Sequence, residues 1–245
     1  MNKGTLYVVP TPIGNLEDIT LRAIRVLQES DSVVCEDTRQ TLKLLSHLKI
    51  SKPLVSFYTQ NQLKRIPQIL SMLNDGKNIA LVSDCGTPAI SDPGYYLIKE
   101  ALNRNVNVVT LPGACALITA LVGSGLATDS FIFLGFLKKK TGKMKKELEL
   151  AKQTQKTVIF YESPHRILKT VEVCKEVFGE NADMVLAREL TKKFEEFVRG
   201  TIKEVLQNLK NRDVLGEFIV LLRLAEPLKN KNENSFFPAL HDAGF

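Results

Sequence analysis

Short apolar runs alternate with helical patterns along the first half of this 245-residue chain. Segments with helical spacing of apolar residues separate runs of strand length at 5–9, 32–35, 54–57, 79–82 and 106–110. Strands that are joined through helices pair in parallel, because a crossover helix returns the chain to the same end of the sheet. The alternation therefore predicts an α/β fold whose first sheet is mainly parallel.

Strand-like runs return in the second half with less regular spacing. They lie at 131–134, 157–161, 183–187, 194–199 and 217–224, and the run at 194 follows the one before it too closely for a crossover helix. This spacing predicts a mixed sheet. We expect the chain to divide into an α/β domain at residues 1–112 and a second α/β domain at 113–226, followed by a polar tail at 227–245 with the composition of a flexible segment.

Three short patterns mark helix boundaries in the second half. Thr201-Ile-Lys-Glu204 is a capping box, and Ser163-Pro164 predicts an N-cap followed by proline at the first helical position. Gly123-Ser-Gly125 follows a helix and lacks the third glycine of a dinucleotide-binding fingerprint. We therefore expect it to be a helix stop and linker.

The run at 79–82 ends in a loop, Ser83 to Gly94, that holds two acidic residues and two prolines. Ligands of open α/β sheets bind at the carboxyl ends of strands. A phosphate-binding loop presents bare backbone amides and usually a lysine, whereas Asp84 directly after a strand suits a ribose hydroxyl or an amino group. We expect a neutral or cationic nucleoside-like ligand here; the alternative is a tight connection in which Asp92 and Pro93 cap the next helix.

Two further loops of similar character follow the first and fifth strands, at Pro10 to Asp18 and Leu111 to Ala116. If the strands are parallel, their carboxyl ends lie along one edge and the three loops form one pocket. The residues of this pocket that we expect to bind the nucleoside-like ligand are Pro10, Pro12, Gly14, Asp84, Gly86, Thr87, Pro88, Pro112, Gly113 and Ala116.

Five segments carry a resemblance to a known family. They are Val8-Val-Pro-Thr-Pro-Ile-Gly-Asn-Leu16, Glu36-Asp-Thr-Arg39, Leu81-Val-Ser-Asp-Cys-Gly-Thr-Pro88, Phe160-Tyr-Glu-Ser-Pro-His-Arg166 and Ala187-Arg-Glu-Leu-Thr-Lys192. In this order they resemble the bacterial ribosomal RNA small-subunit methyltransferase I family, within the tetrapyrrole (corrin/porphyrin) methylase superfamily. The resemblance implies S-adenosylmethionine-dependent 2′-O-methylation of a decoding-centre cytidine in 16S ribosomal RNA. It also implies a cofactor cleft between the two α/β domains and a homodimer. Because the sequence shows neither a membrane helix nor a basic leader pattern, the location that we expect is the cytoplasm.

Methylation of a ribose 2′-hydroxyl requires a base or a cation that lowers the pKa of the hydroxyl. Charged residues follow three predicted strands, and on the expected topology they face one cleft. The catalytic candidates are Lys192, Glu189, Glu162, Asp37 and Arg188. Salt bridges that tie the two domains together are the alternative for Asp37, Arg39 and Arg166, and His165 is a weaker candidate for the base.

Basic residues outnumber acidic ones by 33 to 27, which gives a net charge of +6. Six lysines lie between residues 138 and 146, and such a cluster can neutralise several phosphates of RNA. The RNA-binding candidates are Arg39, Lys138, Lys139, Lys140, Lys143 and Arg166. A solvated helix face is the alternative, and lysines would also suit a carboxylated porphyrin.

Other classes of protein fit the sequence less well. No run approaches the ~20 apolar residues of a membrane helix, and the four scattered cysteines lack the spacing of a zinc site or a disulfide framework. We expect no metal. Two alternatives to the RNA methyltransferase stay open: a methylase of a tetrapyrrole intermediate, and a non-catalytic RNA-binding domain.

Overall fold

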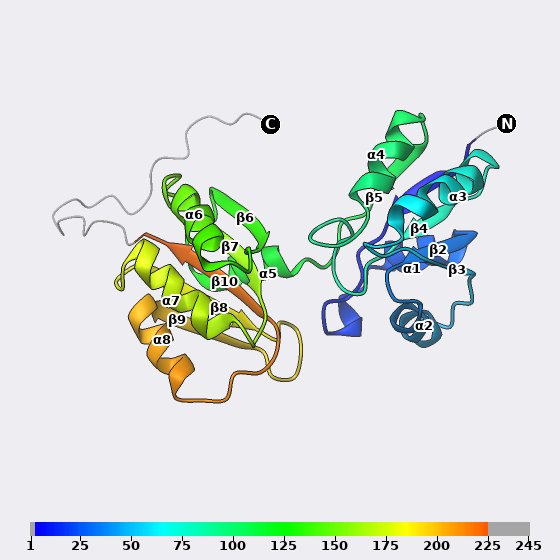
Figure 1. Ribbon diagram of the computed structural model, residues 1–245. Coiled ribbons are helices and arrows are strands. Elements are labelled where there is room, and N and C mark those ends of the chain that lie inside the picture. The colour runs from blue at the N-terminus through cyan, green and yellow to red at the C-terminus, as the bar shows by residue number, and fades with distance from the viewer. Residues whose placement is uncertain (1–2, 225–245) are drawn as a thin grey trace, which may run out of the picture.

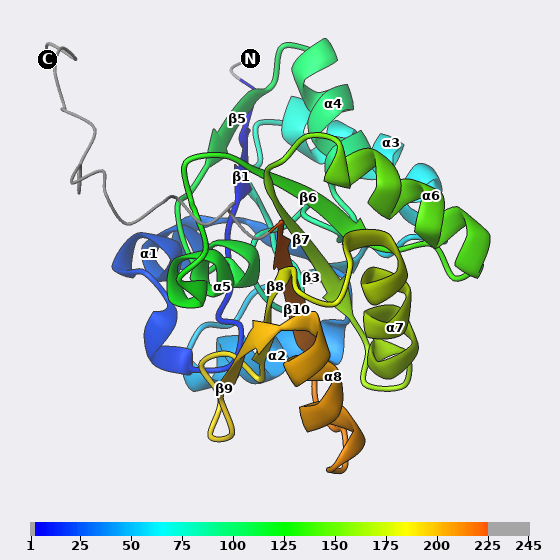
Figure 2. The same ribbon diagram turned by 90° about the vertical axis from the view of Figure 1, so that its left-hand side faces the viewer.

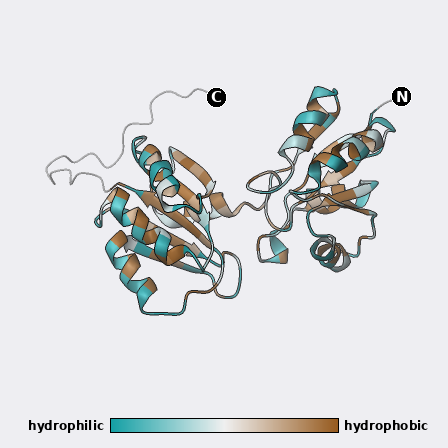
Figure 3. Cartoon of the chain, viewed as in Figure 1, coloured by the Kyte–Doolittle hydropathy of each residue, from teal (hydrophilic) through white to brown (hydrophobic). Residues whose placement is uncertain are grey.

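Residues 3–224 are described by the computed structural model, and they form two five-stranded sheets that lie side by side (Figure 1). Brown, hydrophobic residues concentrate in the strands and on the inner faces of the helices (Figure 3). The predicted polar tail at 227–245 lies outside the described residues. No helix within 3–224 is long and apolar enough to cross a membrane.

The first sheet is parallel throughout, with the order β3-β2-β4-β1-β5. Its strands are β1 (Thr5–Val8), β2 (Ser32–Cys35), β3 (Leu54–Ser56), β4 (Ile79–Leu81) and β5 (Asn107–Thr110). Its helices are α1 (Leu21–Glu29), α2 (Thr38–His47), α3 (Gln62–Asn74) and α4 (Tyr95–Asn103), and the 3-10 helix η1 (Leu16–Asp18) precedes α1. One apolar cluster joins α3 and α4 to one face of the sheet, and a second joins α1 and α2 to the other face.

The second sheet is mixed, with the order β6-β7-β10-β8-β9. Its strands are β6 (Phe131–Phe136), β7 (Thr157–Glu162), β8 (Asp183–Arg188), β9 (Glu196–Thr201) and β10 (Phe218–Arg223). Only β6 and β7 pair in parallel. The predicted α/β fold with a parallel first sheet and a mixed second sheet is therefore confirmed.

Helices cover the two faces of the second sheet unequally (Figure 2). α6 (Thr141–Lys152), α7 (Ile167–Phe178) and α8 (Ile202–Lys210) pack on one face, and α5 (Ala116–Ser124) packs on the other. Side chains of a strand alternate between faces, so Phe160 of β7 points toward α7 while Ile159 and Tyr161 point toward α5. The α5 face also receives Ile13 from the loop after β1, which brings the two halves together.

The expected helix start at Ser163-Pro164 is wrong, and so is the alternative by which Asp92 and Pro93 cap a helix. α7 begins at Ile167, because the Ser163 carbonyl accepts hydrogen bonds from the amides of Arg166 and Ile167 and closes a separate turn ahead of the helix. α4 begins at Tyr95, with Gly94 at φ 146° in the N-cap position, so Asp92 and Pro93 do not cap it. The capping box at Thr201 is confirmed. Gly125 ends α5 in the left-handed conformation, as expected of a helix stop.

Candidate active site

The loops that follow β1, β4 and β5 meet at the carboxyl edge of the parallel sheet, because these strands are neighbours. Thr11 and Gly86 exchange two backbone hydrogen bonds of 2.9 and 3.0 Å. The Thr87 hydroxyl donates to the Ala114 carbonyl at 3.0 Å, which links the second loop to the third. Gly113 packs so closely on Pro10 that a Cβ at position 113 would lie 2.7 Å from the Cβ of the proline. These contacts join the three loops to one another at this edge of the sheet.

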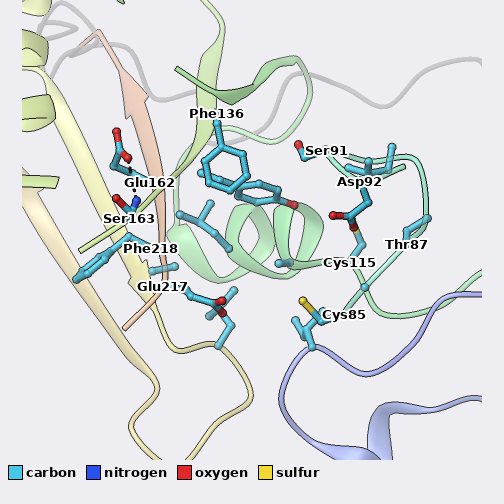
Figure 4. A pocket seen from close by; sticks show the side chains of 18 of the residues that line it. Cys85, Thr87, Ser91, Asp92, Cys115, Phe136, Glu162, Ser163, Glu217 and Phe218 are labelled. Carbon is cyan, nitrogen blue, oxygen red and sulfur yellow. Dashed lines mark hydrogen bonds between the residues drawn. The ribbon is translucent and has the colours of Figure 1, made fainter. Parts of the chain in front are cut away.

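A cavity of about 370 Å³ opens between these loops and the second sheet (Figure 4). Its apolar wall includes Ile13, Ala187, Leu190 and Ile219, and the polar groups around it include Asp92, Lys192 and Glu217. Of the expected cofactor residues, Gly86, Thr87 and Ala116 line the cavity. The other members of that set, Pro10, Pro12, Gly14, Asp84, Pro88, Pro112 and Gly113, lie in the same loops without lining it.

Lys192 borders the cavity and is held between two carboxylates. Its Nζ lies 3.1 Å from Glu189 Oε1 and 3.0 Å from Glu217 Oε2. Burial acts to lower the pKa of Lys192, but hydrogen bonds and charge from Glu217 and Glu189 outweigh burial, so the pKa is raised overall. The amide of Glu217 is the main cause of the lowered pKa of Glu189, and Lys192 adds to it. The structure therefore brings Lys192 and Glu189 together, and it adds Glu217, which the sequence did not indicate.

Asp92 lines the cavity from the loop of the first sheet, and its carboxylate points into it in Figure 4. Burial, followed by the negative charges of Glu36 and Asp84, raises the pKa of Asp92 to about 7, against a smaller opposing effect of a hydrogen bond with Ser83. Ser91 before it has φ 67°, a left-handed conformation that turns the loop. The sequence analysis placed Asp92 in the expected ligand loop, with a helix cap as the alternative, but did not include it among the expected site residues.

Glu162 borders the cavity, but its carboxylate is turned toward α7. It accepts hydrogen bonds from the Thr170 hydroxyl at 2.7 Å and the Ser163 amide at 2.8 Å, and it lies 3.3 Å from Arg166. Arg166 also donates to the Leu137 carbonyl at 3.1 Å. These contacts leave the Glu162 side chain 1% exposed, and the group fixes the turn between β7 and α7.

Asp37 and Arg39 lie at the start of α2 and Arg188 lies at the end of β8; none of the three lines the cavity. Asp37 caps α2 and pairs with Arg39 at 2.9 Å, and the hydrogen bond from Arg39 is the main cause of the lowered pKa of Asp37. Arg188 lies 3.4 Å from Glu196 of β9. The expected catalytic set is thus split: Lys192 lines the cavity and pairs with Glu189, whereas the carboxylate of Glu162 is turned toward α7.

The lysines expected to bind RNA lie on the surface. Lys138, Lys139, Lys140 and Lys143 are exposed between β6 and the first turn of α6, and none forms an ion pair with another residue of 3–224. We call these four residues the lysine cluster. Within the same range no group of His, Cys, Asp and Glu side chains is arranged to hold a metal ion.

A family model described as Tetrapyrrole (Corrin/Porphyrin) Methylases matches residues 5–206. The chain belongs to the tetrapyrrole (corrin/porphyrin) methylase family. Relatives named Ribosomal RNA small subunit methyltransferase I are 48% identical in Halalkalibacterium halodurans, over 90% of this chain and 76% of the relative, and 48% identical in Bacillus subtilis, over 89% and 75%. One from a Hydrogenobaculum strain is also 48% identical and covers 89% of this chain and 94% of its own length.

Several solved structures share the fold at low identity. Diphthine synthase superposes with a TM-score of 0.71 at 14% identity and covers 90% of each chain. A cobalt precorrin-4 methyltransferase gives 0.68 at 18%, over 89% of this chain and 94% of the other. Uroporphyrin-III C-methyltransferase from Thermus thermophilus, in complex with S-adenosylhomocysteine, gives 0.63 at 18%, over 89% and 97%.

As a member of the tetrapyrrole methylase family, the protein is a methyltransferase whose cofactor is S-adenosylmethionine. The cavity fits this group. Its volume lies in the range of roughly 300–1,000 Å³ that is usual for small-molecule sites. Gly86, at φ 80°, presents bare backbone at the wall, and the acidic groups Asp92 and Glu217 suit a cationic ligand.

Proposed function

We propose that this methylase transfers the methyl group of S-adenosylmethionine to the ribose 2′-oxygen of a cytidine in the decoding centre of 16S ribosomal RNA. One observation carries the proposal: the cavity that fits the methyl donor is lined both by Lys192, which two carboxylates hold, and by Asp92 from the first half of the chain, and β6 leads from it to the lysine cluster. The relatives at 45–48% identity are named for a ribosomal RNA substrate. The structures named for corrin and porphyrin substrates are only 17–18% identical, so a tetrapyrrole substrate is less well supported.

The proposed reaction forms an O–C bond to the methyl group and breaks the S–C bond, while the hydroxyl loses its proton. When bound, the cofactor supplies an electrophilic methyl on a positively charged sulfur. The sequence analysis left open whether a charged residue acts as a base or as a cation, and the raised pKa of Lys192 keeps it protonated at neutral pH. We assign it the role of a fixed cation that stabilises negative charge on the attacking oxygen.

The proton passes to Asp92 in this proposal. Asp92 points its carboxylate into the cavity, and a pKa of about 7 lets it accept a proton near neutral pH. Glu189 and Glu217 position the lysine, and the loops at Gly86, Thr87 and Ala116 hold the cofactor. Glu162, Asp37 and Arg188 act in the proposal only through the local structure that they hold.

RNA binding is assigned to the lysine cluster, with Arg39 as an additional contact because its side chain is 87% exposed. Arg166 is left out of the RNA contacts, since it is engaged by Glu162 and by the Leu137 carbonyl. We also propose a homodimer in the cytoplasm. Ile118 and Val122 support the dimer, because these apolar side chains of α5 are 46% and 73% exposed on the face turned away from the second sheet.

The test uses purified protein, labelled S-adenosylmethionine and ribosomal RNA from a strain that lacks the gene. Naked 16S RNA and assembled small subunits are offered separately, and mass mapping locates the modified nucleotide. We expect one 2′-O-methylcytidine in the decoding centre, formed on one of the two substrates. Absence of label from both RNA forms, with normal cofactor binding, would refute the proposal.

A further inference from the structure

Strand β6 contains a β-bulge immediately before it reaches the cavity. Phe131, Ile132 and Phe133 pair with Thr157, Val158 and Ile159 of β7, but Phe136 then pairs with Tyr161, so β6 holds one extra residue. Gly135 lies in the extra stretch with φ 64°, a left-handed conformation that favours glycine. A bulge of this kind re-aims the side chains that follow it.

The bulge turns the Phe136 ring toward the same side as Phe133. In a regular strand, residues three apart face opposite sides of the sheet. Here both rings pack edge-on against Tyr161, with centroids 5.0 Å away for Phe133 and 5.5 Å away for Phe136. Tyr161 lies on the α5 side, where the cavity opens, so the extra residue delivers Phe136 to the cavity wall.

Phe136 lines the cavity and still leaves 56% of its surface exposed. In Figure 4 its ring projects over the cavity, across from Ser91 and Asp92. Leu137, the next residue, is buried in the core beneath α6, and Lys138, Lys139 and Lys140 follow directly. An aromatic face within a few residues of several unpaired cations is the combination by which proteins hold single-stranded nucleic acid, with the ring under a base and the cations on phosphates.

We propose that Phe136 is the stacking platform for the base of the nucleotide whose ribose is methylated. The inference rests on the proposed function, which supplies RNA as the substrate. The base stacks on Phe136, and the neighbouring backbone phosphates of the RNA lie along the lysine cluster. These two contacts together direct the ribose toward Asp92 and Lys192. The occupant is an RNA base and not the adenine of the cofactor. The Phe136 ring extends from the end of β6, next to the lysine cluster, whereas the three loops that hold the cofactor form the opposite wall of the cavity.

The experiment compares two single-stranded ligands of equal length and charge: an oligocytidylate, and a ribose-phosphate oligomer that lacks bases. Their affinities for the wild type, Phe136→Ala and Phe136→Trp are measured by fluorescence anisotropy. Phe131→Ala is the matched control, since Phe131 is an exposed ring of the same strand that does not line the cavity. Calorimetry with S-adenosylmethionine alone measures cofactor affinity for each variant.

We expect Phe136→Ala to weaken oligocytidylate binding by about 5- to 150-fold, as loss of one stacked base does, and to leave the base-free oligomer unaffected. Phe136→Trp and Phe131→Ala should stay within a few fold of the wild type for both ligands. Unchanged oligocytidylate affinity in Phe136→Ala would overturn the inference, as would an equal loss for both oligomers. Loss of cofactor affinity in Phe136→Ala would also overturn it, because the ring would then cover the cofactor.

The stacking role of Phe136 and the proposed function are tested by different measurements. Oligonucleotide binding is measured without methyl transfer, whereas the proposed function is tested by label on ribosomal RNA. A wild type that methylates the RNA, together with a Phe136→Ala variant of normal affinity and KM, would contradict the stacking role alone. A wild type that stacks cytidylate and labels no ribosomal RNA would contradict the proposed function alone.

Discussion

Asp92→Asn should change how the stability of this methylase depends on pH. The carboxyl lies in the cavity wall, where burial comes first and the charges of Glu36 and Asp84 second in raising its pKa from 3.8 to about 7. A rise of that size corresponds to ~4 kcal/mol, at ~1.36 kcal/mol for each tenfold change. Because the side chain is partly exposed, solvent screening reduces the expected effect to about 2 kcal/mol.

The sign follows from proton binding. Between about pH 4 and pH 7 the folded protein keeps a proton on Asp92 that the unfolded chain releases. The free energy of unfolding therefore falls as the pH rises through this window, and no further contribution from Asp92 is lost above it. Asparagine carries no charge at any pH, so the variant should match the wild type near pH 4 and exceed its stability by about 2 kcal/mol at pH 8.

Urea unfolding at pH 4, 5, 6, 7 and 8 measures the difference. Glu36 also has a raised pKa, caused by burial first and then by Asp84 and Asp37, so the variant is compared with the wild type at each pH and the slope of either protein alone is not used. Asp129→Asn is the control, because it removes a carboxylate that is exposed to solvent. A constant difference between Asp92→Asn and the wild type at every pH would refute the reasoning, and so would a difference that shrinks as the pH rises.

Three further outcomes are expected. Lys192→Met keeps the side-chain stem but loses the cation, so methyl transfer should fall ~10²-fold or more while RNA affinity stays within a few fold; retained turnover would contradict its role. Exchanging three lysines of the cluster for glutamine should reduce the slope of log RNA affinity against log salt concentration by about 2 to 3. Exchanging three lysines dispersed elsewhere on the surface, as a control, should reduce this slope by less. Ala116→Leu should fill part of the cavity and weaken cofactor binding at least ~10-fold without loss of folding, and Thr119→Leu, exposed on the same helix, should not.

The fold and the place of the site could be predicted because they depend on periodicity and topology. The alternation of strand-like runs with helical patterns predicted the parallel sheet, and parallel strands bring their carboxyl ends to one edge of the sheet. That argument alone placed the loops of Gly86 and Ala116 in one pocket. The boundary at 112/113 between two domains stays a prediction, although α5, which starts just after it, packs on the second sheet.

Side-chain direction could not be predicted at the strand ends. Glu162 and Tyr161 are adjacent in β7, and the period of two sends the carboxylate toward α7 and the phenol toward the cavity. The alternation of side chains between the two faces of β6 is also interrupted before Phe136, because a bulge of one residue reverses the side that the ring faces. Asp92 was missed for a different reason: Asp-Pro is a common helix start, and only the positions of Ser91 and Gly94 at positive φ show that the chain does not yet enter the helix.

Gly14 and Lys192 were expected in separate roles, one in a cofactor loop and one in catalysis, yet they are in contact. A Cβ at position 14 would lie 2.5 Å from Cγ of Lys192, 2.7 Å from the Thr191 hydroxyl oxygen and 3.0 Å from the Leu190 carbonyl oxygen. The loop after β1 therefore packs on the lysine's own stem, and any side chain there would displace the cation from Glu189 and Glu217. Since the same loop is bonded to Gly86 through Thr11, the position of the lysine depends on the loops that hold the cofactor. The two halves of the methylase thus set the geometry of the cation jointly, which neither motif shows by itself.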